Sequence, residues 1–535
     1  MCVHMSRLEH AAPPLAPPLS RSTSPSPSPI SSRGACSPSP AQLAHPLCCT
    51  ARRAAKYDPK VGFKVTSRAA IANAPFPVDG NGTFSNLQLA AVVLFVPYVL
   101  SRFVPFVSFR TAYVLLLVVT GVPTTIAYWM LMSRANFRVR DEGIFPGKDL
   151  EHYITITDPA LKEQYSGQKK IPMQVFYDNY FAGKIEIKGD MLELLEWRHD
   201  WMSFPMTVEL MRYVLTKLIP DVIFHSAGQD EEQVTDHYDR GDDFHEWFLG
   251  TRMIYTSGVI SDIDRKETLE ELQDNKLAVV CHKLQLKPTD RLLDIGCGWG
   301  TLVTYAAKNF DCDATGVTLS KNQAEFGTKR IADNGVDATK ARILRTDFRN
   351  LDTAQKFDKI VSLEMAEHVG IRRYNTFLAD VYNLLEDDGI LVFQVAGIRP
   401  SWQYEDLNWG LFMNKYVFPG ADASCALNWV IGRLEGAGFE VTNVDVIGVH
   451  YSATLHRWYE NWIKNEDKVK ATYGEKWYRT WLYFLASSVI TSRQGGASCF
   501  QITLHKNLNK YHRVEDIPSH TSLHPTLAKE PKLVV

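Results

Sequence analysis

Asp294-Ile295-Gly296-Cys297-Gly298-Trp299-Gly300 is the stretch of this sequence that decides the fold. The apolar run Arg291-Leu292-Leu293 precedes it, and residues Thr301 to Lys308 follow it with the spacing of an amphipathic helix. This order predicts a strand, a tight glycine turn and a helix N-terminus, which together bring backbone N–H groups close to a nucleotide-like ligand. Glycine suits the turn because a β-carbon would collide with the ligand or forbid a positive φ.

The spacing of the glycines indicates which ligand the turn accepts. Gly-x-Gly-x-Gly directly after an acid differs from the Gly-x-Gly-x-x-Gly pattern that binds dinucleotides. An acid in that place suits a ligand with an amino group or a sulfonium charge better than a pyrophosphate. We therefore expect S-adenosylmethionine, contacted by Asp294, Gly296, Gly298 and Gly300. A purely structural glycine turn in another α/β domain is the alternative.

Further strands alternate with helices on both sides of this turn. Helices are predicted over Leu269–Leu284 and Lys321–Asn334, and the predicted strands are Arg291–Ile295, Ala314–Val317, Ala341–Leu344, Phe357–Ser362 and Gly389–Gln394. This alternation predicts a parallel, doubly wound sheet that binds ligands beyond the carboxyl ends of its strands. Val444–His450 and Cys499–His505 are the expected antiparallel edge strands. The Trp- and Tyr-rich stretch Tyr473–Ile490 predicts a helix that forms a wall of an apolar pocket.

Composition excludes several classes of function. A chain of 535 residues has room for two or more domains, and its formal charge of −2 gives no indication of nucleic-acid binding. The nine cysteines are scattered and form no CxxC pair. They indicate a reducing environment with no disulfide framework and no metal site.

The chain before the α/β core divides into three parts. Residues 1–55 are rich in Pro and Ser and are expected to be disordered, with an organelle targeting peptide as the alternative. Residues 56–140 form an expected membrane region, with transmembrane helices over about 87–107 and 112–132, because each apolar run approaches the ~20 residues that cross a hydrocarbon core. Residues 141–235 form a linking pre-domain, 236–508 the catalytic domain, and 509–535 a disordered tail.

Positive charges flank the expected membrane hairpin on both sides. They are Lys56, Lys60, Lys64 and Arg68 before it, and Arg134, Arg138 and Arg140 after it. The positive-inside rule then places both flanks, and the catalytic domain, in the cytosol. A re-entrant hairpin in one leaflet would give the same orientation.

Five ordered motifs across about half the chain carry a resemblance to a known family. They are His237-Tyr238-Asp239-x-Gly241-Asp242-Asp243-Phe244, the glycine turn, Gly316-Val317-Thr318-Leu319-Ser320-Lys321-Asn322-Gln323, Glu367-His368-Val369-Gly370, and Asn414-Lys415-Tyr416-Val417-Phe418-Pro419-Gly420. With these motifs the chain resembles the cyclopropane fatty-acid synthase and mycolic-acid methyltransferase family. The hairpin and Ser401-Trp402-Gln403-Tyr404-Glu405-Asp406-Leu407 make it most similar to the sphingolipid C9-methyltransferases of fungi.

The resemblance implies a class I S-adenosylmethionine-dependent methyltransferase and assigns further cofactor contacts. Thr318, Leu319 and Gln323 would bind the ribose hydroxyls, in the place where many methyltransferases carry an acid. Tyr255 and Thr256 are also expected to contact the cofactor. Asp347 and Phe348 follow the third strand, where an acceptor for the adenine amino group and a ring to stack on it belong.

The implied acceptor is an alkene, a very weak nucleophile. Methyl transfer to it leaves a carbocation, which aromatic faces stabilise. The candidate rings, considered as a group, are Tyr255, Trp402, Tyr404, Trp409 and Tyr416. A base must then remove a proton: loss from the new methyl closes a cyclopropane, whereas loss from the neighbouring chain carbon restores the double bond.

In the cyclopropane-forming relatives that base is a bound bicarbonate, held by a Glu, a Tyr, a His and a Cys-containing loop. By motif position the Glu is Glu367 and the Tyr is Tyr451, but Ser257 takes the place of the Cys and Gln394 that of the His. Both replacements can still hold an anion. We expect these four residues to be catalytic, and they favour methylation over ring closure. His368 is either a general base or, more in keeping with its position, a structural residue at the strand end.

The resemblance implies methylation of C9 at the Δ8 double bond of a sphingolipid base, in the membrane of the endoplasmic reticulum. The alternative is a cyclopropane synthase acting on phospholipid acyl chains. A third hypothesis is an inactive methyltransferase fold that serves as a membrane scaffold. The glycine turn, Gln323 and Glu367 argue against that third hypothesis.

Overall fold

The computed structural model describes residues 56–58, 63–65, 85–134, 148–218, 220, 241–399, 404–419 and 425–509. The two segments expected to be disordered lie outside these residues, apart from Asn509. Two short strands, β1 (Lys56–Asp58) and β2 (Phe63–Val65), pair antiparallel.

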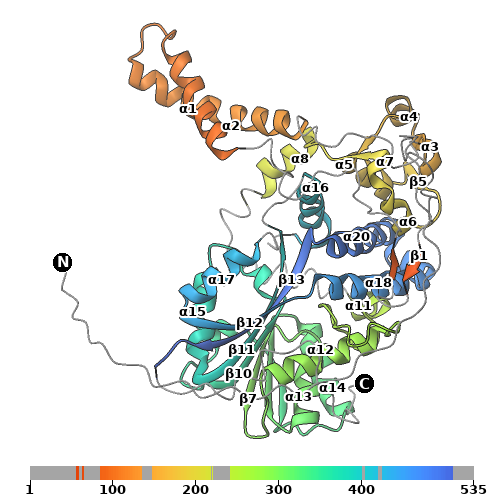
Figure 1. Cartoon of the computed structure of the whole chain (residues 1–535), viewed down its shortest axis with the longest axis vertical. Helices are drawn as coiled ribbons and strands as arrows, with labels where there is room; N and C mark the ends of the chain where they lie inside the picture. The colour runs from red at the N-terminus through yellow and green to blue at the C-terminus, as the bar shows by residue number, and fades with distance from the viewer. Residues whose placement is uncertain are drawn as a thin grey trace, which may run out of the picture. The chain divides into compact units, whose positions relative to one another are not determined.

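A seven-stranded sheet in the order β12-β13-β11-β10-β7-β8-β9 carries the catalytic domain (Figure 1). Its strands are β7 (Arg291–Ile295), β8 (Asp313–Thr318), β9 (Ala341–Arg345), β10 (Phe357–Leu363), β11 (Leu385–Ile398), β12 (Phe439–Val446) and β13 (Ala497–Lys506). The strands β7 to β11 pair in parallel, and β13 pairs antiparallel with both β11 and β12. The prediction of a doubly wound parallel sheet with an antiparallel edge is confirmed.

Alternating apolar side chains bury both faces of this sheet. In β7, Leu292 packs in one core cluster and Leu293 in another, as the two-residue period of a strand requires. The first cluster includes side chains of α12 (Leu269–Lys283) and α13 (Thr301–Phe310). The second includes side chains of α15 (Tyr374–Leu384) and α17 (Leu427–Gly436). Helix α14 (Lys321–Asp333) contacts β8 and β9.

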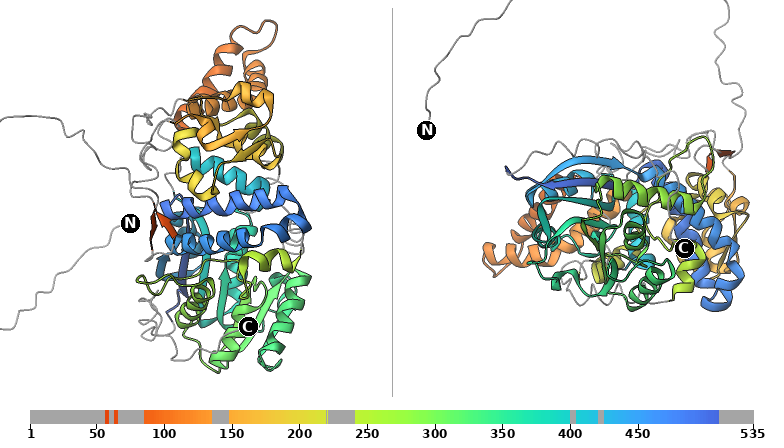
Figure 2. Two further views of the ribbon diagram at one scale, coloured as in Figure 1. Left: turned by 90° about the vertical axis from the view of Figure 1, so that its right-hand side faces the viewer. Right: turned by 90° about the horizontal axis from the view of Figure 1, so that it is seen from below.

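The last third of the domain differs from the sequence prediction at one edge strand. A strand was expected over Val444–His450, but β12 ends at Val446 and Gly448 begins α18 (Gly448–Lys464). The physical reason is the period of the buried residues: Leu455, Trp458 and Trp462 recur at helical spacing. Helix α18 packs along α20 (Glu475–Gln494), as the two views of Figure 2 also show.

The pre-domain is a set of short elements around an aromatic core. Its elements are α3 (Leu150–Tyr153), β3 (Ile154–Ile156), α4 (Pro159–Gln164), β4 (Ile171–Pro172), α5 (Met173–Phe181), β5 (Ile185–Ile187), α6 (Met191–Glu196), α7 (Arg198–Trp201), β6 (Met202–Ser203), α8 (Val208–Tyr213) and the π-helix η2 (Val214–Leu218). Phe176, Tyr177 and Trp201 share one apolar cluster with α20. Helix α20 packs against α18 and also against α5 and α6 of the pre-domain. Its residues Tyr483, Ser487, Ile490 and Thr491 line a small cavity, and none of its residues lines the large cavity described below.

Two helices near the N-terminus form a hairpin, α1 (Asn86–Ser101) and α2 (Phe109–Arg134), which pack against each other. Many of their apolar side chains are exposed, among them Phe95, Val118 and Val119. Helix α1 has 16 residues and spans about 24 Å, less than the ~30 Å hydrocarbon core. Among the described residues only α2 is long and apolar enough to cross a membrane. The prediction of two spanning helices is therefore not supported.

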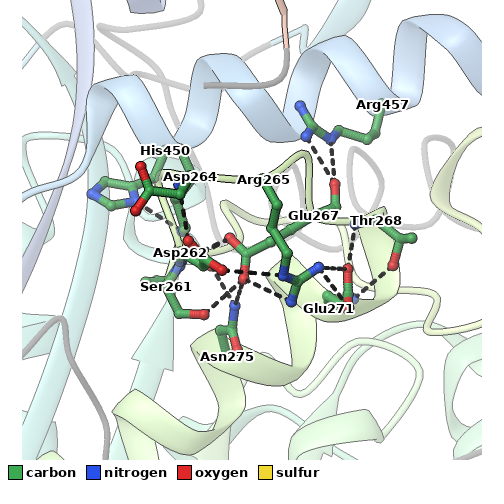
Figure 3. A network of polar contacts seen from close by, with 12 residues as sticks. Ser261, Asp262, Asp264, Arg265, Glu267, Thr268, Glu271, Asn275, His450 and Arg457 are labelled. Carbon is green, nitrogen blue, oxygen red and sulfur yellow. Dashed lines mark hydrogen bonds and ion pairs between the residues drawn. The ribbon is translucent and has the colours of Figure 1, made fainter. Parts of the chain in front are cut away.

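A polar network holds the loop that leads from α11 (Asp242–Leu249) to α12 (Figure 3). The carboxylate of Glu267 accepts from Ser261 N at 2.9 Å and from Asn275 Nδ2 at 2.8 Å. The backbone oxygen of Glu267 accepts from Arg457 on α18. This network holds the segment from Ser261 to Glu267 against α12 and α18.

Arg479 on α20 joins the catalytic domain to the pre-domain. Its guanidinium donates to the backbone oxygens of Tyr180 at 3.2 Å and Ile185 at 3.1 Å, and to the Glu186 carboxylate at 2.7 Å. Arg479→Met removes these three hydrogen bonds, two of them to buried carbonyl oxygens, so we expect the free energy of unfolding to fall by about 2–4 kcal/mol. Lys329→Met, at an exposed helix pair, is the control. Equal unfolding midpoints for the two variants in denaturant titration would contradict this role.

Candidate active site

A large cavity opens at the carboxyl ends of the parallel strands. It encloses about 1360 Å³, its open mouth included. Residues predicted to bind the cofactor line it: Tyr255, Thr256, Asp294, Gly296, Gly298, Thr318, Leu319, Gln323, Asp347 and Phe348. Gly300, the residue that caps the N-terminus of α13, is the one predicted cofactor residue outside this lining. The sequence therefore predicted one common site from motifs spread over nearly a hundred residues.

The glycine turn has the conformation that its sequence predicts. Gly296, Gly298 and Gly300 have φ of +79°, +52° and +74°. A β-carbon on Gly296 would lie 2.6 Å from Met365 Cγ, and one on Gly300 would lie 3.0 Å from Gly327 Cα. Side chains at these positions would therefore collide with the neighbouring strand end and helix. Their absence allows the backbone of the turn to approach a ligand closely.

Asp294 is fully buried beside this turn. Burial raises its pKa from 3.8 to about 7, and the nearby charge of Lys276 opposes the rise. Lys276 is buried as well, so its pKa falls to about 8, although the attraction of Glu364 and Asp294 works in the other direction. Its ammonium donates to Thr256 Oγ1 at 2.9 Å. The floor of the cavity thus carries two carboxyl groups, Asp294 and Glu364, beside one ammonium, which suits a cationic ligand.

The expected ribose and adenine contacts lie on neighbouring strand ends. Thr318 donates its hydroxyl to Gln323 Oε1 at 2.7 Å, so the amide nitrogen of Gln323 can be presented to ligand hydroxyls. Asp347 accepts from the guanidinium of Arg349, and the Phe348 ring meets Phe377 edge to face at 5.4 Å. A nucleoside of the S-adenosylmethionine type fits these groups and the turn.

Glu364 is a carboxylate of the cavity that the sequence analysis did not single out. It directly follows β10, has φ +55° and lines the cavity. Its Oε1 accepts from Ser257 N at 3.0 Å, Gln394 Nε2 at 2.5 Å and Cys499 Sγ at 3.4 Å. Tyr451 also hydrogen-bonds this carboxylate. A Glu directly after a buried strand, at the edge where ligands bind, was the signal available in the sequence.

Three of the four residues predicted to be catalytic thus surround Glu364. Ser257 uses its backbone N–H, since its hydroxyl donates to the Gly258 oxygen. Tyr451, on α18, has a pKa raised by burial and by the charge of Glu364. Its hydroxyl therefore stays protonated and donates a hydrogen bond to the Glu364 carboxylate. Gln394 contributes its amide NH₂ group.

The orientation of the Gln394 amide is determined by a hydrogen-bonded chain that starts at Lys283. An ammonium only donates, so Gln501 Oε1 must accept from Lys283 Nζ, at 2.6 Å. Gln501 Nε2 then donates to Gln394 Oε1 at 2.8 Å, which turns the NH₂ group of Gln394 to Glu364. Lys283 itself is paired with Asp445.

The fourth predicted catalytic residue, Glu367, lies behind this group. It belongs to the 3-10 turn η4 (Ala366–His368), is buried, does not line the cavity, and accepts from Ala396 N at 2.5 Å. Burial, and then the charge of Glu364, raise the pKa of Glu367 to about 8. His368 lines the cavity, and burial lowers its pKa to about 4, so it is neutral at physiological pH.

The proposed aromatic group is dispersed in the structure. Only Tyr255 lines the large cavity, with its ring centroid 5.4 Å from that of Trp458 and 5.7 Å from that of Phe418. Trp409 lines a smaller cavity of about 290 Å³. Tyr416, in the π-helix η5 (Met413–Val417), bonds to Asp178, and Tyr404 begins α16 (Tyr404–Phe412). Trp402 lies outside the described residues.

A mostly parallel sheet with a glycine turn, a buried acid and a nucleoside-sized cavity at its carboxyl edge defines the class of S-adenosylmethionine-dependent methyltransferases. Comparison with known proteins agrees with this class. The family described as mycolic acid cyclopropane synthetase matches residues 225–502. The sphingolipid C9-methyltransferase of Komagataella phaffii is 51% identical over 478 residues, which cover 88% of this chain and 97% of that protein.

More distant relatives carry other names. The cyclopropane-fatty-acyl-phospholipid synthase of Escherichia coli is 34% identical over 279 residues, 52% of this chain and 69% of that protein. A solved mycolic acid cyclopropane synthase, complexed with SAH and CTAB, is 29% identical, has a TM-score of 0.49 and covers 52% of this chain and 98% of its own. The chain belongs to the mycolic acid cyclopropane synthetase family and, within it, to the sphingolipid C9-methyltransferases.

The glycine turn gives a first test of the site. Gly296→Ala forces a β-carbon toward Met365, so we expect the affinity for S-adenosylmethionine to fall about 10-fold or more, as measured by calorimetry. Gly335→Ala is the matched control, because Gly335 has φ +66° but open space around its Cα. Equal affinities of the two variants would show that the turn does not contact the cofactor.

The raised pKa of Asp294 predicts a pH-dependent affinity. The carboxyl loses its proton as the pH rises through about 7, and the charged form attracts a sulfonium ligand. Affinity for S-adenosylmethionine should therefore increase between about pH 6 and about pH 8. Asp294→Asn should bind more weakly and show a smaller pH dependence, while ionisation of the ligand itself affects both proteins equally. The same slope in both proteins would exclude Asp294 as its origin.

Proposed function

We infer that this chain transfers a methyl group from S-adenosylmethionine to C9 at the Δ8 double bond of a sphingolipid base. The observation that carries the substrate class is the 51% identity with a sphingolipid C9-methyltransferase over nearly the whole length of both proteins. The synthase that acts on fatty-acyl phospholipids is only 34% identical and covers half of this chain. Cyclopropane formation on phospholipids is therefore the less favoured alternative.

The residues of the cavity divide into a cofactor half and an acceptor half. Bound S-adenosylmethionine would supply an electrophilic methyl group. Asp294, the glycine turn, Thr318, Gln323, Asp347 and Phe348 hold and orient it, and Lys276 balances the charge of the two nearby carboxylates. Tyr255 presents an aromatic face on the acceptor side, where an alkyl cation would be stabilised.

Access to a lipid substrate is supported by the helical hairpin. Ile126 and Met130 of α2 pack against Met206, Leu210 and Leu411, which belong to the pre-domain and to α16. The exposed apolar side chains of α1 and α2 suit a lipid environment. We propose that α2 inserts into the membrane, that α1 lies partly in it, and that the catalytic domain faces the cytosol at the endoplasmic reticulum.

Lipid analysis tests this function directly. Cells that lack the protein should accumulate a sphingoid base lighter by one CH₂ unit, with their acyl chains unchanged, as measured by mass spectrometry. Re-expression of the wild-type protein or of Gly335→Ala should restore the methylated base. Disappearance of cyclopropane rings from acyl chains, with the sphingoid base unaltered, would instead identify a phospholipid cyclopropane synthase.

A further inference from the structure

We propose that Glu364 is the general base of the reaction and takes the place of a bound anion such as bicarbonate. The inference rests on the proposed function, because it concerns the proton that is lost after methyl transfer. In this proposal a residue of the chain itself accepts that proton.

The hydrogen-bond donors that could hold a separate anion are already bonded to Glu364. Ser257 N, Gln394 Nε2 and Cys499 Sγ all point to Glu364 Oε1, and Tyr451 bonds the same carboxylate. A second anion would need these same donors and would lie against the negative charge of Glu364. A bound bicarbonate therefore does not fit the described site.

The position and charge of Glu364 suit it as a base. It is half-buried and lines the cavity, whereas Glu367 is buried behind it and bonds the Ala396 backbone. Four donors and the nearby ammonium of Lys276 surround the Glu364 carboxylate. Three of the donors meet Oε1, so Oε2 is the oxygen with the capacity to accept a proton.

The proton transfer balances without any further reactant. Methylation at C9 uses the π electrons of the double bond and leaves the positive charge on C8. Glu364 then forms an O–H bond with the proton on C9, and the C9–H electron pair closes the C8=C9 double bond. The methylated product is neutral, and the Glu364 carboxylate has become a carboxylic acid. Glu364 returns this proton to solvent before the next cycle.

The backbone of Glu364 gives independent support. A non-glycine residue at φ +55° is uncommon, and such conformations are concentrated at functional sites. Glu364 N donates to Gln394 O at 2.7 Å, so the same strand neighbour holds both the backbone and the side chain. These two hydrogen bonds fix the orientation of the Glu364 carboxylate before any substrate binds.

The test uses the full-length protein in vesicles that contain a Δ8-unsaturated ceramide, with buffers freed of bicarbonate. Wild-type turnover should be unchanged by that depletion. Glu364→Gln should lose about 100-fold or more of turnover, the usual size of a general-base contribution, and keep its calorimetric affinity for S-adenosylmethionine. The amide oxygen of Gln can accept the same three hydrogen bonds, so a purely structural role would survive this change. Glu325→Gln, at an exposed glutamate, is the control.

A second variant separates the base from the fold. Glu364→Gly removes the side chain and leaves its donors in place, so added bicarbonate or formate should restore turnover. A bicarbonate requirement of the wild-type protein would overturn the proposal, and that measurement needs no variant. Retained turnover in Glu364→Gln together with its loss in Glu367→Gln would also overturn it and assign the base to Glu367.

Failure of the proposed function has a different signature. If vesicle phospholipids acquire cyclopropane rings while ceramide stays unmethylated, the substrate assignment fails. The response of that product to bicarbonate and to Glu364→Gln still decides whether Glu364 is the base.

Discussion

The buried ammonium of Lys276 is the charge on which the chemistry of this site depends. It attracts both Asp294, at the glycine turn, and Glu364, on the acceptor side. When Asp294 is ionised, Lys276 balances one of these two carboxylates, and a ligand with one positive charge would neutralise the other. Removing two carboxylates from water without such a partner would cost more than their hydrogen bonds return. The cofactor half and the acceptor half of the cavity are therefore linked electrostatically as well as by the sheet.

Helices α18 and α20, which lie between β12 and β13 in the sequence, connect the site with the rest of the molecule. Helix α18 carries Tyr451 into the site and Arg457 onto the Glu267 network, and α20 packs beside it. Through Arg479 and the aromatic cluster, α20 also holds the pre-domain. The pre-domain and α16 in turn contact the hairpin helix α2 through a separate apolar cluster. Continuous packing thus connects the helical hairpin with the catalytic domain.

The sequence predicted the sheet and the cofactor side of the site well, because both depend on local patterns. The apolar period around Leu292 and the glycine spacing are readable without tertiary contacts. The acceptor side was only partly predicted. Ser257, Gln394 and Tyr451 were found by motif position, but Glu364 was not, since its role arises from donors up to 135 residues away in sequence. The first hairpin helix was predicted to end at about residue 107, because apolar composition does not show that α1 ends at Ser101, whereas α2 extends beyond the predicted 112–132 at both ends.

The chain of hydrogen bonds from Lys283 through Gln501 to Gln394 has a consequence for robustness. A histidine in the place of Gln394 would change its donors and acceptors with each proton that it gained or lost. Two amides cannot titrate, so the direction of this chain is the same at every pH at which Lys283 keeps its proton. Changes of pH that leave Lys283 protonated therefore do not reverse the amide of Gln394 that donates to Glu364.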